Sequence, residues 1–211
     1  MSSNPHEATP TLSWLTDPQK FAVNRIPARS DHATSIPQQT LDGPWEVRLV
    51  DDGTFSVESP RSILSDIFDT EKVHTINVPS TLETEGLWDP VYLNIQMPWD
   101  GHEDPIAPDV PQGRVAVYRR TFKLEDDLHK IFNEGGSIRL AFGGFATALY
   151  IWLDGVFVGY CEDGYTTNEF DISSHLAQLP EITAEHELIV ACYQYSSASW
   201  LEDQDSWRFH G

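Results

Sequence analysis

The stretch TALYIWLDGVFVGY, residues 147–160, decides the fold. Asp154 and Gly155 at its centre are typical of a type I′ β-turn, because glycine readily adopts the positive φ that this turn requires. The turn predicts a hairpin with three cross-strand pairs: Leu153 with Val156, Trp152 with Phe157, and Ile151 with Val158. Both faces of this hairpin are apolar or aromatic, so we expect it to be covered on both sides within a layered structure.

Other segments with the alternating pattern of β-strands and flanking turn residues lie on both sides of the hairpin. They are residues 41–50, 74–80, 114–124, 137–144, 166–173 and 186–195. With about eight strands and no long helix, the chain is predicted to be an all-β protein. We expect a two-sheet sandwich of the jelly-roll type, with an immunoglobulin-like sandwich as the alternative.

Two parts of the chain lack this regular pattern. Residues 1–40 are rich in Pro, Ser, Thr and Gln, and we interpret them as an extended N-terminal arm that precedes a domain of residues 41–211. Residues 79–112 form a proline-rich connection, which cannot belong to the interior of a sheet. A connection of this length is usually functional or disordered, and its aromatic residues Trp88, Tyr92 and Trp99 indicate that it packs against something.

The composition excludes several classes of partner. The formal net charge of −20 disfavours binding to nucleic acid and to anionic lipid. No apolar run is long enough to cross a bilayer, and the N-terminus does not have the pattern of a signal peptide. The two cysteines, Cys161 and Cys192, both lie in predicted strands and are expected to be buried free thiols. Together these features favour a cytoplasmic protein.

Common catalytic and metal-binding motifs are not found. The 8 histidines are scattered and show no zinc-ligand spacing with cysteine. The glycine pairs do not form a phosphate-binding loop before a helix, and no serine lies in a nucleophile elbow. These observations disfavour a structural zinc site, a nucleotide site and a serine hydrolase.

The C-terminal run SASWLEDQDSWRFHG, residues 197–211, concentrates acids between tryptophans. Glu202, Asp203 and Asp205 lie too close together in sequence to act as the separated carboxylate pair of a glycosidase. A solvated acidic loop is the simplest interpretation. The flanking aromatic residues argue that the run is held against protein, so some of the acids need a partner such as Arg208, sugar hydroxyls or a metal ion.

The run SWLEDQDSWRFHG resembles the segment that closes the first, sugar-binding domain of glycoside hydrolase family 2 β-galactosidases. Upstream motifs match the same family in order: FAVNRIPARS, LDGPWEVRL, INVPSTLETEGLWDPVYLNIQMPW, YIWLDGVFVGY and NEFDIS. The resemblance covers residues 21–211 and implies a galactose-binding-domain-like jelly roll. The chain departs from the family at His210, where Ser is usual, and at Gln112–Arg114, where the family has Asn-Pro after Val-Pro.

The resemblance also implies a function. A parent enzyme would hydrolyse terminal β-galactosides with retention of configuration, using glutamates of a (β/α)₈ barrel that follows in the family. We therefore expect the polypeptide to continue past Gly211 and the 211 residues alone to be inactive. Asn94 and Asp205 match the two positions that contact galactose hydroxyls, and Asp205 also matches a ligand of a Na⁺ site completed by the barrel. Mg²⁺ is implied for the parent enzyme outside this chain.

Other interpretations stay open at this point. Asn94 would instead cap a turn, and Asp205 would instead bond to backbone amides. Trp88 and Trp99 are more consistent with packing than with stacking on a sugar. The whole chain would alternatively be a free-standing carbohydrate-binding module, or a structural domain whose arm supports a homo-oligomer. Related activities on glucuronides or mannosides share the sandwich but resemble these motifs less.

Overall fold

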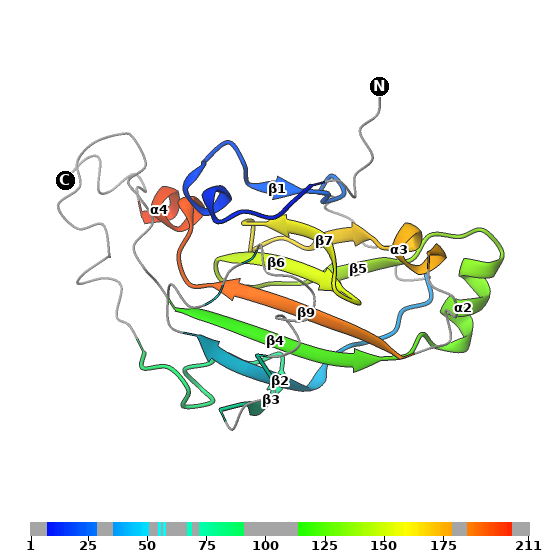
Figure 1. Ribbon diagram of the computed structural model, residues 1–211, viewed down its shortest axis with the longest axis horizontal. Helices are drawn as coiled ribbons and strands as arrows, with labels where there is room; N and C mark the ends of the chain where they lie inside the picture. The colour runs from blue at the N-terminus through cyan, green and yellow to red at the C-terminus, as the bar shows by residue number, and fades with distance from the viewer. Residues whose placement is uncertain are drawn as a thin grey trace.

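The computed structural model describes residues 8–28, 36–50, 55, 57, 67–68, 72–90, 114–178 and 185–203 (Figure 1). Within these ranges the regular elements are the 3-10 helix η2 (Leu12–Thr16), β1 (Ala22–Val23), β2 (Gly43–Val50), β3 (His74–Val78), β4 (Val115–Phe122), α2 (Asp126–Asn133), β5 (Arg139–Phe142), β6 (Ala148–Leu153), β7 (Val156–Cys161), β8 (Asn168–Asp171), α3 (Ser173–Ala177), β9 (His186–Tyr193) and α4 (Ser197–Asp203). Each strand predicted from the sequence is present. Most of the connection at 79–112 lies outside the described residues.

The strands form two antiparallel sheets. The larger sheet has seven strands in the order β1-β7-β6-β9-β4-β2-β3, and β5 pairs with β8 in a second, two-stranded sheet. The second sheet lies behind β6 and β7, while α2 and α3 close one end of the molecule (Figure 1). This all-β arrangement of two packed sheets is the predicted jelly-roll sandwich.

The central hairpin of β6 and β7 has the predicted turn. Asp154 and Gly155 both have positive φ, at 50° and 74°, and the pairs next to the turn are those expected. The prediction for Ile151 was wrong, because Ile151 pairs with Gly159 rather than with Val158. A β-bulge causes the difference, since it places an extra residue in β7 and reverses the alternation of side chains beyond it.

The bulge determines on which face of the large sheet the side chain of Tyr160 lies. With strict alternation Tyr160 would share a face with Val158, but after the bulge it packs with Tyr150 on the opposite face of the sheet. Gly159 allows this geometry because a Cβ there would lie 2.5 Å from the Phe170 ring and 2.7 Å from the carbonyl oxygen of Val23. The hairpin is therefore covered on both faces, as its apolar composition predicts.

One hydrophobic core fills the space between the large sheet and the β5–β8 sheet. Its members are apolar residues of both sheets and of the adjoining segments: Trp45, Phe122, Ile138, Leu140, Leu149, Ile151, Leu153, Val158, Cys161, Phe170, Ile172, Leu176, Leu188 and Val190. Helix α2 adds Leu128, Ile131 and Phe132, which lie on one helical face and pack against this core. This helix was not predicted from the sequence.

A second core covers the opposite face of the sheet and includes the N-terminal segment. Trp14 is 8% exposed, and its ring stacks on that of Tyr150 at 5.9 Å between centroids. The hydroxyl of Tyr150 donates to the carbonyl oxygen of Thr11 at 2.8 Å. Ala22 and Val23 then pair with the end of β7 as the edge strand β1. Residues 8–28 thus lie along the sandwich as an integral layer (Figure 1).

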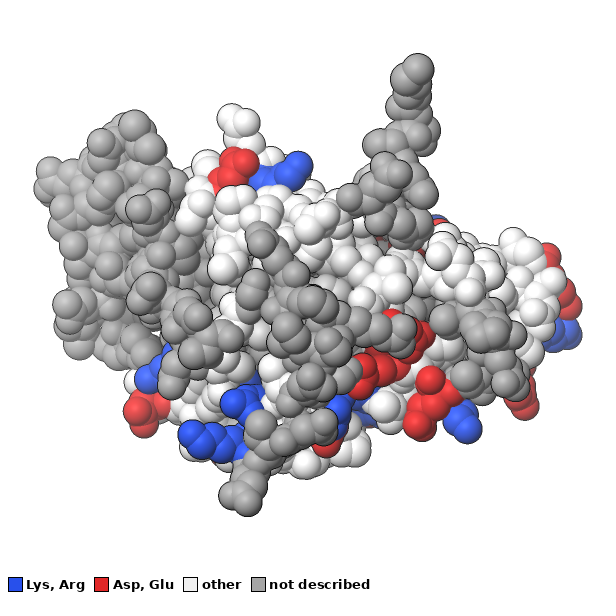
Figure 2. Space-filling view, viewed as in Figure 1, with Lys and Arg blue, Asp and Glu red and all other residues white. Residues whose placement is uncertain are grey.

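The far edge of the large sheet is charged. Charged side chains of both signs lie along the lower edge of the molecule, over β2, β3 and β4 (Figure 2). Arg119 contacts Glu46 at 2.7 Å and lies 4.4 Å from the ring centroid of Phe68. A partly exposed ion pair of this kind contributes little stability by itself. Among the described helices, none is long and apolar enough to span a bilayer.

Both cysteines are free thiols, as predicted, but only Cys161 is fully buried. Cys161 is buried in the core between the sheets, and Cys192 is partly buried on β9. Burial raises the pKa of the Cys161 thiol and raises the pKa of Cys192 to about 12. Neither cysteine therefore has the thiolate character of a reactive residue.

Candidate functional site

The two residues that the resemblance assigns to substrate contact, Asn94 and Asp205, lie outside the described residues. Helix α4 (Ser197–Asp203) ends two residues before Asp205, and the side chains of Glu202 and Asp203 at its end also lie outside the description. The structure describes the parts of the sandwich that adjoin the segments carrying Asn94 and Asp205.

The connection that carries Asn94 rejoins the sheet beside the segment that leads to Asp205. The carbonyl oxygen of Arg114 accepts from the backbone N–H of Gln194 at 3.0 Å. The backbone N–H of Arg114 donates to Gln194 Oε1 at 3.3 Å. The first bond extends the ladder between β4 and β9 by one residue, and the Gln194 side chain makes the second. Arg114, just after the connection that carries Asn94, and Gln194, the first residue after β9, are therefore held together at one end of the sheet.

The other end of the same connection lies near this point. The Arg114 guanidinium lies 5.7 Å from the ring centroid of Trp88, close enough for a cation–π contact. Trp88 is partly buried and packs against a small apolar cluster that includes Ile76, Leu82 and Ala116. The structure therefore supports a packing role for Trp88, which was the interpretation favoured from the sequence. Trp99 lies outside the described residues.

The start of α4 is held by serine hydroxyls. The Ser199 hydroxyl accepts from the backbone N–H of Ser196 at 2.9 Å and donates to its carbonyl oxygen at 2.7 Å. The Thr147 hydroxyl donates to Ser196 Oγ at 3.2 Å and so links this residue to the start of β6. Ser196, Ser197 and Ser199 are all buried. The helix therefore begins at a fixed place on the sheet.

A buried carboxylate completes this attachment. Glu162 follows β7 and is 3% exposed. Its Oε2 accepts from the Ser197 hydroxyl at 3.0 Å and from the Ala198 backbone N–H at 2.9 Å. The hydroxyl of Tyr160 donates to the other oxygen, Oε1. A strand of the sandwich thus supplies an acceptor for the first turn of a helix 35 residues further along the chain.

Burial dominates the protonation of this group. Desolvation raises the pKa of Glu162, while the bonds from Tyr160, Ser197 and Ala198 favour the charged form and partly oppose it. Burial and the neighbouring Glu162 carboxylate also raise the pKa of Tyr160, which therefore remains a neutral hydroxyl donor.

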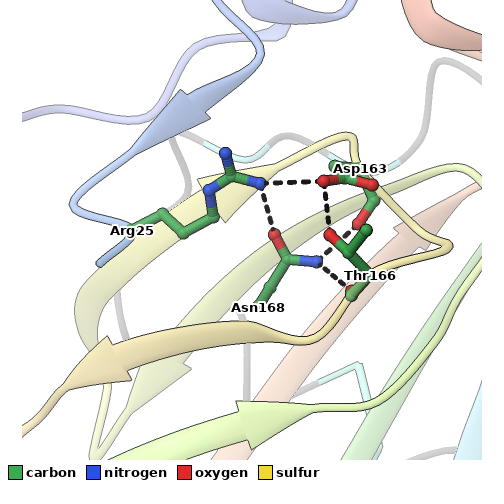
Figure 3. Close-up of polar contacts among 4 residues, drawn as sticks. All are labelled: Arg25, Asp163, Thr166 and Asn168. Atoms are coloured by element: carbon green, nitrogen blue, oxygen red, sulfur yellow. Dashed lines mark hydrogen bonds and ion pairs between the residues drawn. The ribbon is translucent and has the colours of Figure 1, made fainter. Parts of the chain in front are cut away.

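The next residue, Asp163, takes part in a separate network that holds the N-terminal segment (Figure 3). Arg25 Nη1 donates to Asn168 Oδ1 at 2.8 Å and lies 3.4 Å from Asp163 Oδ2. The Thr166 hydroxyl donates to the same Asp163 oxygen at 2.5 Å. The Asn168 amide donates to the carbonyl oxygens of Asp163 and Thr166, at 2.5 and 2.8 Å. The β7–β8 connection therefore anchors the segment that contains Arg25.

These two networks were not predicted from the sequence. Arg25 lies in the quoted motif FAVNRIPARS, but the motif alone does not identify its partner. Glu162 and Asp163 follow a buried strand, where polar residues usually mark a surface turn. The relevant signal, an acid immediately after a fully apolar strand, is too common to distinguish a buried acceptor from a solvated one.

Metal ligands and other polar partners are described only in part. Among the described residues, no group of three or more His, Cys, Asp or Glu side chains is arranged to hold a metal ion. Leu201 on α4 is 51% exposed, so the apolar residues of the C-terminal run do not all pack against this domain. The proposed pairing of the acidic run with Arg208 lies outside the described residues.

Comparisons with known proteins agree on one family. The profile described as "Glycosyl hydrolases family 2, sugar binding domain" matches residues 38–211. The chain is 49% identical over 219 residues to the β-galactosidase BgaC of Bifidobacterium adolescentis, covering 98% of this chain and 21% of that protein. It is 40% identical over 212 residues to a β-galactosidase of Lactobacillus delbrueckii subsp. bulgaricus, covering 95% and 20%.

A solved structure, the β-glucuronidase of Bifidobacterium dentium complexed with coumarin-3-O-glucuronide, is 22% identical with a TM-score of 0.45, covering 74% of this chain and 21% of that one. The chain spans about a fifth of the length of the curated relatives it matches.

Proposed function

Because the chain belongs to the family of sugar-binding domains of glycosyl hydrolases family 2, we propose that it is the sugar-binding domain of a β-galactosidase. The observation that carries this proposal is the 49% identity, over 98% of the chain, to a protein named as a β-galactosidase. The parent enzyme then removes terminal non-reducing β-D-galactose residues. Hydrolysis proceeds with retention, through two carboxyl groups on either side of the scissile bond.

In this proposal the chain forms one wall of the galactose pocket. Asn94 and Asp205 are the two residues that contact sugar hydroxyls. A carboxylate is a strong acceptor for hydroxyl groups, and a side-chain amide both donates and accepts. The pairing of Arg114 with Gln194 supports this arrangement. It holds together the ends of β4 and β9, which adjoin the segments that carry Asn94 and Asp205. The bond-breaking carboxyl groups belong to the rest of the parent enzyme, so this domain alone is inactive.

Asp205 also serves as a ligand of Na⁺ in this proposal, together with residues of the catalytic barrel. Sodium is a hard cation, and a carboxylate oxygen suits it as it suits other hard cations. Asp205 lies outside the described residues. Mg²⁺ binds elsewhere in the parent enzyme.

Two further properties complete the proposal. The parent enzyme is cytoplasmic, in keeping with two free thiols and a net charge of −20. It forms a homo-oligomer to which the first 40 residues contribute. The close packing of residues 8–28 on the sandwich supports this, because it gives the arm a fixed place from which to reach a neighbouring subunit.

The substrate preference is tested with the full-length parent enzyme. Its kcat/KM is measured with p-nitrophenyl β-galactoside, β-glucuronide and β-mannoside, and we expect the galactoside to exceed the others by at least about 100-fold. A preference for the glucuronide or the mannoside would contradict the proposal, because it would place the enzyme among the sister activities of the family.

The pocket residues are tested by substitution in the same enzyme. Asp205→Ala and Asn94→Ala each reduce kcat/KM for the galactoside by about 10- to 100-fold, since each removes hydrogen bonds to the sugar. Glu85→Ala is the control, because Glu85 is an exposed acid in the turn near the start of the long connection and should leave kcat/KM unchanged. Equal activity in all three variants would show that this domain does not line the pocket.

A further inference from the structure

Helix α4 needs outside support to keep its position. It has seven residues, which is too short to be stable by its own hydrogen bonds. Leu201 is half exposed, so packing does not enclose this helix. The first backbone N–H groups of any helix lack acceptors within the helix itself. The orientation of α4 therefore depends on the groups that bind its first turn.

Glu162 supplies the acceptor that comes from a strand. Its Oε2 binds both the hydroxyl of Ser197 and the backbone N–H of Ala198, while its Oε1 binds the hydroxyl of Tyr160. Tyr160 is fully buried and packs on Tyr150, so the carboxylate is itself held rigidly. The side chain of Glu162 therefore links β7 to the first turn of α4.

A small change in the orientation of the first turn produces a larger displacement at the far end of the helix. Seven residues extend about 10 Å at 1.5 Å per residue, so a tilt of about 10° at the first turn moves the far end by about 2 Å. Asp205 follows that far end by two residues. A displacement of about 1 Å in a substrate-contacting group is enough to lower a catalytic rate by about 100-fold.

We propose that Glu162 is a positioning residue: its buried carboxylate sets the orientation of α4 and thereby places the acidic run against the sugar. This inference rests on the proposed function and adds to it a residue outside the pocket. Glu162 touches neither substrate nor reacting atoms in this proposal. It acts through Ser197 and Ala198.

The test uses three variants of the full-length parent enzyme. Glu162→Ala removes both acceptor oxygens. Glu162→Gln keeps an oxygen for Ser197 and Ala198 and presents an amide N–H₂ to the oxygen of Tyr160. Asp154→Ala is the matched control, because Asp154 is also a carboxylate that accepts a backbone N–H, from Glu187 at 2.8 Å, and pairs with His186 at 2.9 Å. It precedes β7, at the end opposite Glu162, and does not contact α4.

Three quantities are measured for each variant: kcat/KM for a β-galactoside, the inhibition constant of free galactose, and the melting temperature. We expect Glu162→Ala to lower kcat/KM by about 100-fold and to weaken galactose binding by about tenfold. Glu162→Gln should restore both to within about threefold of wild type. Asp154→Ala should lower the melting temperature comparably but leave kcat/KM and galactose binding unchanged.

The outcomes separate a positioning role from a purely structural one. If Glu162→Ala behaves as Asp154→Ala does, with a lower melting temperature and unchanged galactose binding, Glu162 only stabilises the fold and the inference is wrong. If Glu162→Ala does not fold, Ser197→Ala carries the test: it removes one of the bonds to Glu162, and we expect about a fivefold weakening of galactose binding. Unchanged binding there would equally overturn the inference. If the wild-type enzyme does not act on β-galactosides, it is the proposed function that fails.

Discussion

At the scale of single residues, the buried charge of Glu162 predicts a dependence of stability on pH. Desolvation raises the pKa of Glu162 in the folded state above its unfolded value. Its contribution to stability is therefore fully present below the unfolded pKa and is lost as pH rises through the folded pKa. The adjacent hydroxyls of Tyr160 and Tyr150 stay neutral, because burial raises the pKa of both. Glu162→Gln, which has no charge to desolvate, should gain stability relative to wild type as pH rises.

This prediction is checked by the melting temperatures of wild type and Glu162→Gln between pH 5 and pH 8. The difference between the variant and the wild type should become more positive across this range. A difference that does not vary with pH would mean that the protonation of Glu162 is not linked to folding.

Asn168 offers a second test at this scale. It is 0% exposed; its Oδ1 accepts from Arg25, and its amide N–H₂ donates to two carbonyl oxygens. Asn168→Asp preserves the shape but replaces both donors with an oxygen that repels those carbonyls. We expect a loss of about 3 kcal/mol in the local free energy of unfolding near neutral pH, and a smaller loss when the new carboxyl is protonated.

Hydrogen–deuterium exchange of the β7–β8 connection in the full-length protein measures this local free energy. Asn133→Asp is the control, because Asn133 is exposed at the end of α2 and the same change there should cost less than about 0.5 kcal/mol. Equal protection from exchange in the two variants would show that the hydrogen bonds of Asn168 do not stabilise the β7–β8 connection.

At the scale of elements, the bulge in β7 brings the strand into close contact with β8 and β1. A Cβ at Gly159 would lie 2.5 Å from the ring of Phe170 and 2.7 Å from the carbonyl oxygen of Val23. Gly159→Ala should therefore destabilise the domain by about 2–3 kcal/mol, because both neighbours would have to move. Gly143→Ala is the matched control: a Cβ there meets nothing within 4 Å, so the change should be neutral or slightly stabilising. Limited proteolysis at increasing urea concentration compares the two, and equal sensitivity would contradict the packing at Gly159.

The same elements show how far the sequence predicts the fold. Strands were predictable because their patterns are local: β2 alternates apolar and polar residues, while β4 and β9 carry short apolar runs flanked by turn residues. The bulge was not, because its position depends on contacts with β1 and β8 that are distant in sequence. Helix α2 carries apolar residues at Leu128, Ile131 and Phe132, a genuine helical spacing, but over eight residues the signal is too short to stand out.

The candidate site was predictable only in part. Asn94 and Asp205 were identified by the resemblance of their motifs, and they stay predictions. The attachment of α4 by Glu162 has no local signature, because the partners lie 35 residues apart and meet only after the sheet has formed. The same holds for Arg25 and Asn168, which are 143 residues apart. Buried polar contacts of this kind follow from the fold and not from any sequence pattern.

At the scale of the whole molecule, the N-terminal segment is predicted to be a structural layer of the domain. Trp14 packs on Tyr150, Phe157 and Tyr160, so the segment covers the rings at the centre of the second core. Trp14→Ala should cost about 3–5 kcal/mol, as is usual when a large buried aromatic side chain is removed. Loss of this cover would also release β1 and with it Arg25, because both follow in the same segment.

The measurement is hydrogen–deuterium exchange across β1, β7 and the β7–β8 connection in the full-length protein, with Leu12→Ala as the control. Leu12 lies two residues away in the same 3-10 helix but is 42% exposed, so its truncation should change local stability by less than about 0.5 kcal/mol. Trp14→Ala should instead increase exchange in all three segments together. If exchange rose only around residue 14, the segment would be a peripheral attachment, and the buried Tyr150–Tyr160 core would be stable without it.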